Sequence, residues 1–162
     1  MTSPFLESYG GQSTEELLAL AGKYRIDSLV LAFEQAIQAK AKPSKEEGYV
    51  LAIEALEREV NNGGYSQFFT NSSNEFTASV ESALRAINCP KTADITRDAI
   101  AALGTDGDLS PDAVSEAAQD DDEVGTRLGE CDNRYFSNDE PIADRLFAWI
   151  EANKGKIRVG DT

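Results

Sequence analysis

The chain has 162 residues, of which 29 are acidic, 15 are basic and none is histidine, so its formal charge at pH 7 is −14. This length fits one domain of ordinary size, and 41% hydrophobic residues suffice for one core. The absence of histidine excludes Ser-His-Asp and Cys-His catalysis and most zinc sites, and the negative charge argues against direct binding of nucleic acid, because phosphate contacts need Lys and Arg.

No membrane span and no secretory signal are expected. The chain has no run of about 18 apolar residues, and residues 1–11 lack a basic segment followed by an apolar one. We therefore expect a cytoplasmic protein. Cys89 and Cys131 lie outside any C-x-x-C spacing, among apolar residues at helical spacing, so we expect buried, inert thiols in place of a redox pair.

Apolar residues recur at helical spacing along almost the whole chain. The predicted helices have apolar positions that span, in order, residues 17–24, 26–37, 49–60, 76–87, 93–103, 112–118, 124–135 and 142–150. No segment alternates between apolar and polar residues for more than four positions, and we find no internal repeat. The sequence therefore predicts an all-α fold, a single compact domain of seven or eight helices.

Several residues predict where these helices begin and end. Ser44 with Glu47 three residues later is a capping-box pattern at the start of the third helix. Residues 61–64, Asn-Asn-Gly-Gly, are expected to end that helix and to lead into a loop through residue 73, because glycine adopts the left-handed conformation found just past a helix end. Pro90 is expected to separate the fourth helix from the fifth. Ser110, followed by Pro111, is expected to begin the sixth.

The negative charge is concentrated in one part of the chain. Residues 104–153 hold 14 acidic and three basic side chains, with a peak at residues 120–123. Asp112 and Glu116 are four residues apart and share one helix face, and residues 120–123 extend this row at the start of the next helix, where negative charge suits the helix dipole. The candidate surface for binding a basic partner comprises Asp106, Asp108, Asp112, Glu116, Asp120, Asp121, Asp122 and Glu123. A solvated face that only keeps the protein soluble is the alternative.

Two other chemistries for these carboxylates have less support. Residues 106–112, with the pattern Asp-x-Asp-x-Ser-x-Asp, resemble the start of a calcium loop, but Pro111 and Ala117 replace the glycine and the glutamate that such a loop requires. We expect a turn and a helix cap there, and no metal or cofactor. Catalysis by paired carboxylates needs two carboxyl groups at a fixed separation in a cleft, so a hydrolase remains a third hypothesis.

The most distinctive segment of the sequence is residues 62–73, Asn-Gly-Gly-Tyr-Ser-Gln-Phe-Phe-Thr-Asn-Ser-Ser. A Gly-Gly loop can cradle phosphate, but no Lys or Arg lies between Arg58 and Arg85. We therefore expect a structural role, in which the glycines turn the chain, the aromatic residues enter the core, and the amides of Asn62, Gln67 and Asn71 satisfy nearby backbone groups.

This segment resembles the signature of a bacterial domain family that is best known through a DNA-mimic protein. In that signature a helix ends in Asn-Gly-Gly-aromatic-x-Gln-Phe-Phe, followed after one residue by Asn and a small residue. The matching positions are Asn62, Gly63, Gly64, Tyr65, Gln67, Phe68, Phe69, Asn71 and Ser72. The resemblance extends over about residues 14–153, and leaves an N-terminal segment, residues 1–13, and a short basic C-terminal tail, residues 154–162.

The resemblance implies an all-helical domain that can form homodimers, and the family signature carries no catalytic assignment. In the characterised member, the acidic surface imitates the phosphates of duplex DNA and occupies the DNA-binding face of a transcription regulator. For this chain we expect a non-enzymatic protein that binds a basic or DNA-binding protein through its acidic surface. The alternative from a different class is a structural or accessory interaction domain whose acidity serves only solubility.

Overall fold

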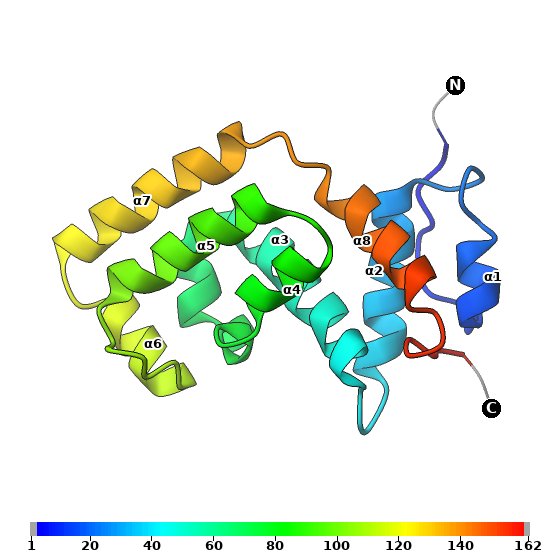
Figure 1. Cartoon of the computed structure of the whole chain (residues 1–162), viewed down its shortest axis with the longest axis horizontal. Coiled ribbons are helices and arrows are strands. Elements are labelled where there is room, and N and C mark those ends of the chain that lie inside the picture. The colour runs from blue at the N-terminus through cyan, green and yellow to red at the C-terminus, as the bar shows by residue number, and fades with distance from the viewer. Residues whose placement is uncertain (1–2, 161–162) are drawn as a thin grey trace. The chain divides into compact units, whose positions relative to one another are not determined.

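A computed structural model describes residues 3–160 as helices joined by short connections, with no β-strand in that range (Figure 1). The helices are α1 (Thr14–Leu18), α2 (Ile26–Gln38), α3 (Lys45–Thr70), the 3₁₀-helix η1 (Ser72–Phe76), α4 (Val80–Ala86), α5 (Pro90–Leu103), α6 (Pro111–Ala118), α7 (Asp122–Ser137) and α8 (Ile142–Ala152). The predicted all-α class is confirmed. Within the described range, no helix has both the length and the apolar character needed to cross a membrane.

The chain divides into two compact units. The described part of unit 1 comprises residues 3–54 and 141–160, with α1, α2, α8 and the first part of α3. Helices α2 and α8 pack on each other. Phe33 of α2 and Leu146 of α8 are fully buried, so their apolar spacing identified the faces that form this core.

The segment expected to be a basic tail is partly buried in unit 1. Ile157 and Val159 are 0% and 3% exposed, and residues 157–159 follow a turn after α8 in extended form. Sequence alone indicated only that this segment is basic, through Lys154, Lys156 and Arg158. The domain boundary at residue 153 remains a prediction.

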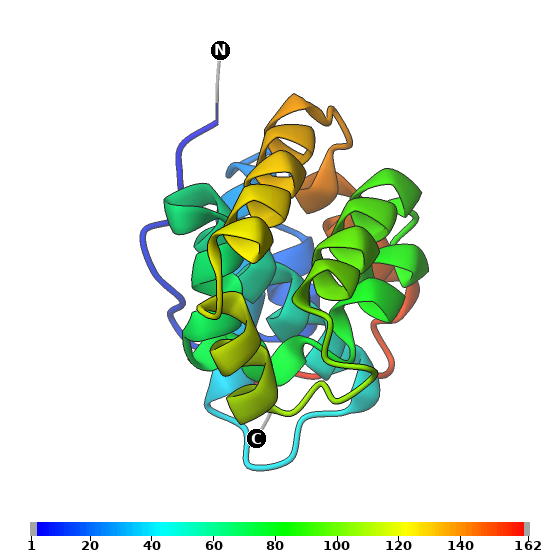
Figure 2. The same ribbon diagram turned by 90° about the vertical axis from the view of Figure 1, so that its left-hand side faces the viewer.

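Unit 2 comprises residues 55–140, with the second part of α3, η1 and helices α4 to α7. Helix α5 packs against both α4 and α7, and Figure 2 shows it from the end where α6 and α7 begin. Cys89 and Cys131 are buried, as predicted, and are not joined in a disulfide. Burial raises the pKa of Cys131, which favours an inert thiol.

The predicted helix boundaries need three corrections. Helix α1 ends at Leu18, earlier than its apolar spacing suggested. The fifth helix begins at Pro90 and not after it. Proline fits the first turn of a helix, because an N–H at that position would have no partner within the helix. The loop expected up to residue 73 is also wrong, because residues 65–70 are helical and η1 follows. The capping box at Ser44 is confirmed, with Glu47 N–H donating to the serine hydroxyl over 3.0 Å.

Glu140 caps α5 from a distant part of unit 2. Its carboxylate accepts hydrogen bonds from the N–H groups of Lys91 and Thr92, at 3.0 and 2.8 Å, and from the Thr92 hydroxyl at 2.7 Å. Burial acts to raise the pKa of Glu140, but these hydrogen bonds keep it below the usual value. The carboxylate therefore stabilises the fold in its ionised form.

We expect Glu140→Ala to lower the free energy of unfolding by about 1–2 kcal/mol at pH 7, since α5 loses its cap. A depressed folded pKa contributes stability above the ordinary value near 4.5 and loses it as the pH falls through the folded value, so the difference should shrink in acid. Urea melts at pH 7 and at acidic pH measure both effects. Asp139→Asn is the control, because the Asp139 side chain is 91% exposed and should contribute little. An equal loss in both variants would contradict the capping role.

Candidate functional site

Gly63 and Gly64 break α3 into two helical parts in the middle of the signature segment. Gly64 has φ 78° and ψ −179°, a conformation that only glycine adopts readily, so the predicted positive φ is confirmed. A Cβ at this position would lie 2.4 Å from Oδ2 of Asp132. The position therefore requires glycine both for its backbone conformation and for its close approach to α7.

The helix resumes after Gly64 because Asp132 of α7 caps its second part. Asp132 Oδ1 accepts a hydrogen bond from the N–H of Tyr65 over 2.8 Å. The Tyr65 ring is fully buried, and its hydroxyl lies 2.8 Å from Oγ1 of Thr96. Phe68 and Phe69 are also 0% exposed. The aromatic residues of the signature thus build the core of unit 2.

The side-chain amides of the signature do not make the backbone hydrogen bonds that we expected. Asn71 donates to the Glu59 carboxylate over 2.7 Å and not to the backbone. The backbone carbonyls of Phe69 and Phe68 are instead satisfied by Asn74 and Ser73, at 2.8 and 3.0 Å. Asn62 is exposed and Gln67 half-buried. Side chains just after the motif therefore close this turn, which the motif alone did not indicate.

A half-buried carboxylate, Glu57, lies on α3 upstream of the turn. It accepts a hydrogen bond from the Tyr135 hydroxyl of α7. Burial raises the pKa of Glu57, although the hydrogen bonds from Tyr135 and Asn61 act to lower it. Burial likewise raises the pKa of Asp132. Ionisation of either carboxylate therefore destabilises the folded state.

We expect Glu57→Gln to stabilise unit 2 by up to about 1 kcal/mol more at pH 7 than at pH 4, because it removes the cost of an ionised, half-buried group and keeps a hydrogen-bond acceptor for Tyr135. The sign follows from the raised pKa of Glu57 in the folded state. The protonated Glu57 side chain contributes stability below the ordinary pKa of 4.5, and this contribution is lost as the pH rises through the folded-state pKa. Denaturant melts of both proteins at the two pH values test this. The prediction would be contradicted if the stability difference, variant minus parent, were smaller at pH 7 than at pH 4.

The candidate acidic residues lie on the connection before α6, on α6 itself and at the start of α7. We call residues 106–123 the acidic segment. It begins with a turn in which Asp106 and Gly107 have φ values of 53° and 87°, and Asp108 accepts a hydrogen bond from the N–H of Ser110 over 3.1 Å. The hydrogen bonds from Ser110 lower the pKa of Asp108. Within residues 3–160, no group of three or more acidic or cysteine side chains is arranged to hold a metal ion.

All eight candidate carboxylates of the acidic segment are exposed. Asp112 and Glu116 lie on α6. Asp121 caps α7, because its side chain accepts a hydrogen bond from the N–H of Val124 over 2.8 Å. Glu123 forms an ion pair with Arg127 at 2.7 Å. Together with Asp108, three of the eight therefore also have a structural role.

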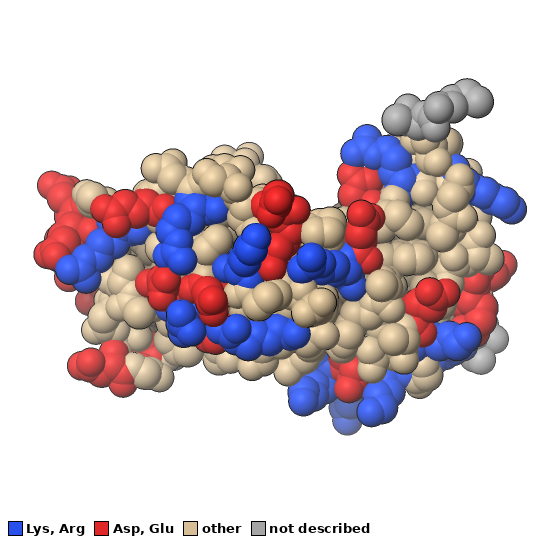
Figure 3. All heavy atoms as spheres, turned by 45° about the horizontal axis from the view of Figure 1, so that its top comes forward, with Lys and Arg blue, Asp and Glu red and all other residues tan. Residues whose placement is uncertain are grey.

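The acidic segment differs from helices α4 and α5 in how its charge is compensated. On α4, α5 and α7, arginine side chains bind the nearby carboxylates, and Arg85 lies 2.8 Å from both Glu81 and Asp94. Arg134 lies 2.8 Å from Asp98. Among the described residues, Glu123 alone of the eight acidic-segment carboxylates has an ion-pair partner. Figure 3 shows acidic side chains gathered at its left-hand end, whereas acidic and basic side chains alternate beside them.

Two pockets in unit 2 give no support to carboxylate catalysis. One, of about 380 Å³, is lined by Asp94 and Asp139 together with Lys91 and Arg134. The other, of about 340 Å³, lies beside Cys131. The hydrogen bond from Arg85 lowers the pKa of Asp94, whereas a catalytic acid needs a raised pKa. The carboxylates with raised pKa values, Glu57 and Asp132, line neither pocket.

The fold and its surface define an all-helical protein with an uncompensated acidic segment. The chain belongs to the family of DMP19-like proteins, whose family model matches residues 41–153. This match contains both the signature turn and the acidic segment, and it confirms the resemblance to a DNA-mimic family. No curated protein and no solved structure matches the chain.

Proposed function

We propose that this protein is a DNA mimic that acts without catalysis, and that its acidic segment occupies the DNA-binding face of a transcription regulator or another basic protein. Membership of the DMP19-like family supports a role in binding DNA-binding proteins. The observation that carries the proposal for this chain is the exposed and largely uncompensated charge of residues 106–123.

Carboxylates on a folded surface can replace DNA phosphates because a DNA-binding face presents Lys and Arg at matched positions. B-DNA carries one negative charge per about 1.7 Å of its axis. A row of exposed carboxylates offers charge of the same sign, and it offers no base edges to be read. Binding should therefore depend steeply on salt and should select proteins by their DNA-binding surface.

The distribution of ion pairs favours a binding surface over charge that serves only solubility. Charge for solubility can lie anywhere on a surface and can be mixed with basic groups. Here the carboxylates of α5 are held by arginines, whereas Asp112 and Glu116 of α6 are exposed and have no ion-pair partner among the described residues. An uncompensated row costs self-repulsion, which a basic partner would relieve.

The test is capture from a bacterial lysate on the immobilised protein at about 50 and about 200 mM salt. DNA-binding proteins should be enriched at low salt and released at high salt, as identified by mass spectrometry. A purified protein of equal basicity that does not bind DNA is the control, and it should be retained far less. Salt-independent retention, or equal retention of the control, would leave the solubility role standing.

A further inference from the structure

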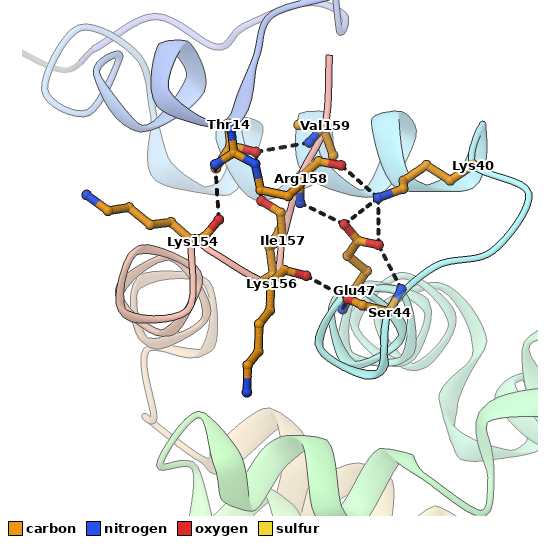
Figure 4. A network of polar contacts seen from close by, with 9 residues as sticks. All are labelled: Thr14, Lys40, Ser44, Glu47, Lys154, Lys156, Ile157, Arg158 and Val159. Carbon is orange, nitrogen blue, oxygen red and sulfur yellow. Dashed lines mark hydrogen bonds and ion pairs between the residues drawn. The ribbon is translucent and has the colours of Figure 1, made fainter. Parts of the chain in front are cut away.

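Residues 156–159, which we call the strap, are held in unit 1 through their backbone (Figure 4). Thr14 Oγ1 donates a hydrogen bond to the carbonyl of Ile157 over 2.7 Å and accepts one from the N–H of Val159 over 3.0 Å. Thr14 is fully buried. One hydroxyl therefore satisfies two backbone groups of the strap on either side of residue 158.

The other side of the strap is held by an ion pair between the half-buried Lys40 and the buried Glu47. Lys40 Nζ contacts both carboxylate oxygens of Glu47, at 2.6 and 2.8 Å, and the Glu47 side chain is 1% exposed. The same carboxylate accepts the N–H of Arg158 over 2.7 Å, and Lys40 donates to the carbonyl of Arg158 over 2.8 Å. Ser44 donates to the carbonyl of Lys156 over 2.7 Å. Side chains of the unit thus bind the main chain throughout the strap.

The strap side chains alternate between buried aliphatic positions and basic positions that are exposed at Lys156 and half-buried at Arg158. Ile157 and Val159 are buried. Arg158 binds Glu15 through two nitrogens at 2.6 and 2.7 Å, and Lys156 lies 4.0 Å from Glu46. The buried side of the strap is therefore aliphatic, and carboxylates lie beside its two basic side chains.

The end of the strap fits closely against the N-terminal segment. Gly160 has φ 65°, and a Cβ there would lie 2.1 Å from the carbonyl oxygen of Gln12. Backbone thus meets backbone at this point, and no side chain can be accommodated. Gly155, on the turn before the strap, has no atom within 4 Å of such a Cβ, so it offers a matched control.

We propose that unit 1 contains a binding groove for an extended peptide in which aliphatic and basic residues alternate, and that residues 156–159 occupy it as a tethered ligand. Main-chain recognition combined with alternate side-chain pockets is how proteins bind extended peptides. Such recognition does not require that the peptide belong to the same chain. The short tether gives the strap an effective concentration in the millimolar range, so a free peptide must compete with it.

The test uses a fluorescent peptide with the sequence of residues 155–160 and the full-length protein. In the opened variant, Ile157→Asp with Val159→Asp, the strap can no longer enter its pockets, and the peptide should bind at least about tenfold more tightly than to the parent. Gly160→Ala should act in the same direction, whereas Gly155→Ala should bind like the parent. Fluorescence anisotropy measures all four proteins. Equal binding to all of them, or to none, would overturn the proposal.

Two further measurements separate recognition in the groove from other effects. Thr14→Val in the opened variant removes two hydrogen bonds to the peptide and should weaken binding about tenfold. A peptide with Ile and Val each moved by one position keeps the composition but loses the register, and it should not bind. If the opened variant loses helical circular dichroism, saturating peptide should restore it, and failure to do so would count against the groove. The strap shares no residue with the acidic segment, so these results are independent of the proposed function.

Discussion

Replacing Gly64 with valine should lower the free energy of unfolding by about 3 kcal/mol. The backbone at this position has φ 78° and ψ −179°, which a β-branched residue does not adopt without strain. The new Cβ would also displace the Asp132 carboxylate, which caps Tyr65. Chemical denaturation followed by circular dichroism measures the loss.

Gly48→Ala is the matched control on the same helix. A Cβ at Gly48 would meet no atom within 4 Å, and alanine in a helix interior gains up to about 1 kcal/mol over glycine. The two substitutions should therefore change stability in opposite directions. If Gly64→Val melted like the parent but lost binding to a small ligand, the turn would be a ligand site and not a structural element.

Neutralising four carboxylates of the acidic segment should weaken binding to a basic partner by roughly 1–4 kcal/mol, because each exposed charge contributes about 0.2–1 kcal/mol. The variant combines Asp112→Asn, Glu116→Gln, Asp120→Asn and Asp122→Asn. It leaves out Asp121, which caps α7, and Glu123, which pairs with Arg127. Its stability should stay equal or rise slightly, since like charges in the folded state repel one another. Titrations at two salt concentrations should show a flatter salt dependence than the parent.

The control for that variant removes the same number of charges elsewhere. Its substitutions are Glu7→Gln, Glu75→Gln, Asp144→Asn and Glu151→Gln, all at exposed positions outside residues 106–123. If the acidic segment is the interface, this control should keep most of the affinity. Equal losses in both variants would show that only net charge matters and would remove the segment from the interface.

Local sequence predicted the helices better than their connections. The apolar spacing of α2 identified its buried face, because a helix repeats every 3.6 residues. The two glycines predicted the break in α3 and the positive φ of Gly64. The resumption of the helix at Tyr65 could not be predicted, because the capping carboxylate of Asp132 is 67 residues away in sequence.

The candidate surface was only partly visible in the sequence. Counting charges located the acidic segment, but the sequence could not say which carboxylates are compensated. That depends on arginines brought close by folding, as when Arg134 reaches Asp98 from 36 residues away. The sequence did not reveal the strap, because two aliphatic residues, Ile157 and Val159, are too few to indicate a buried extended segment in a stretch recognised only as basic.

The most direct test of the DNA-mimic proposal is competition between this protein and duplex DNA for a captured DNA-binding protein. With the partner bound to a labelled duplex, adding this protein should release the duplex and form a protein–protein complex, as fluorescence anisotropy would show. At fixed salt, more duplex should reverse the release, because both ligands use one basic surface. A ternary complex, in which the partner holds duplex and protein together, would contradict the account.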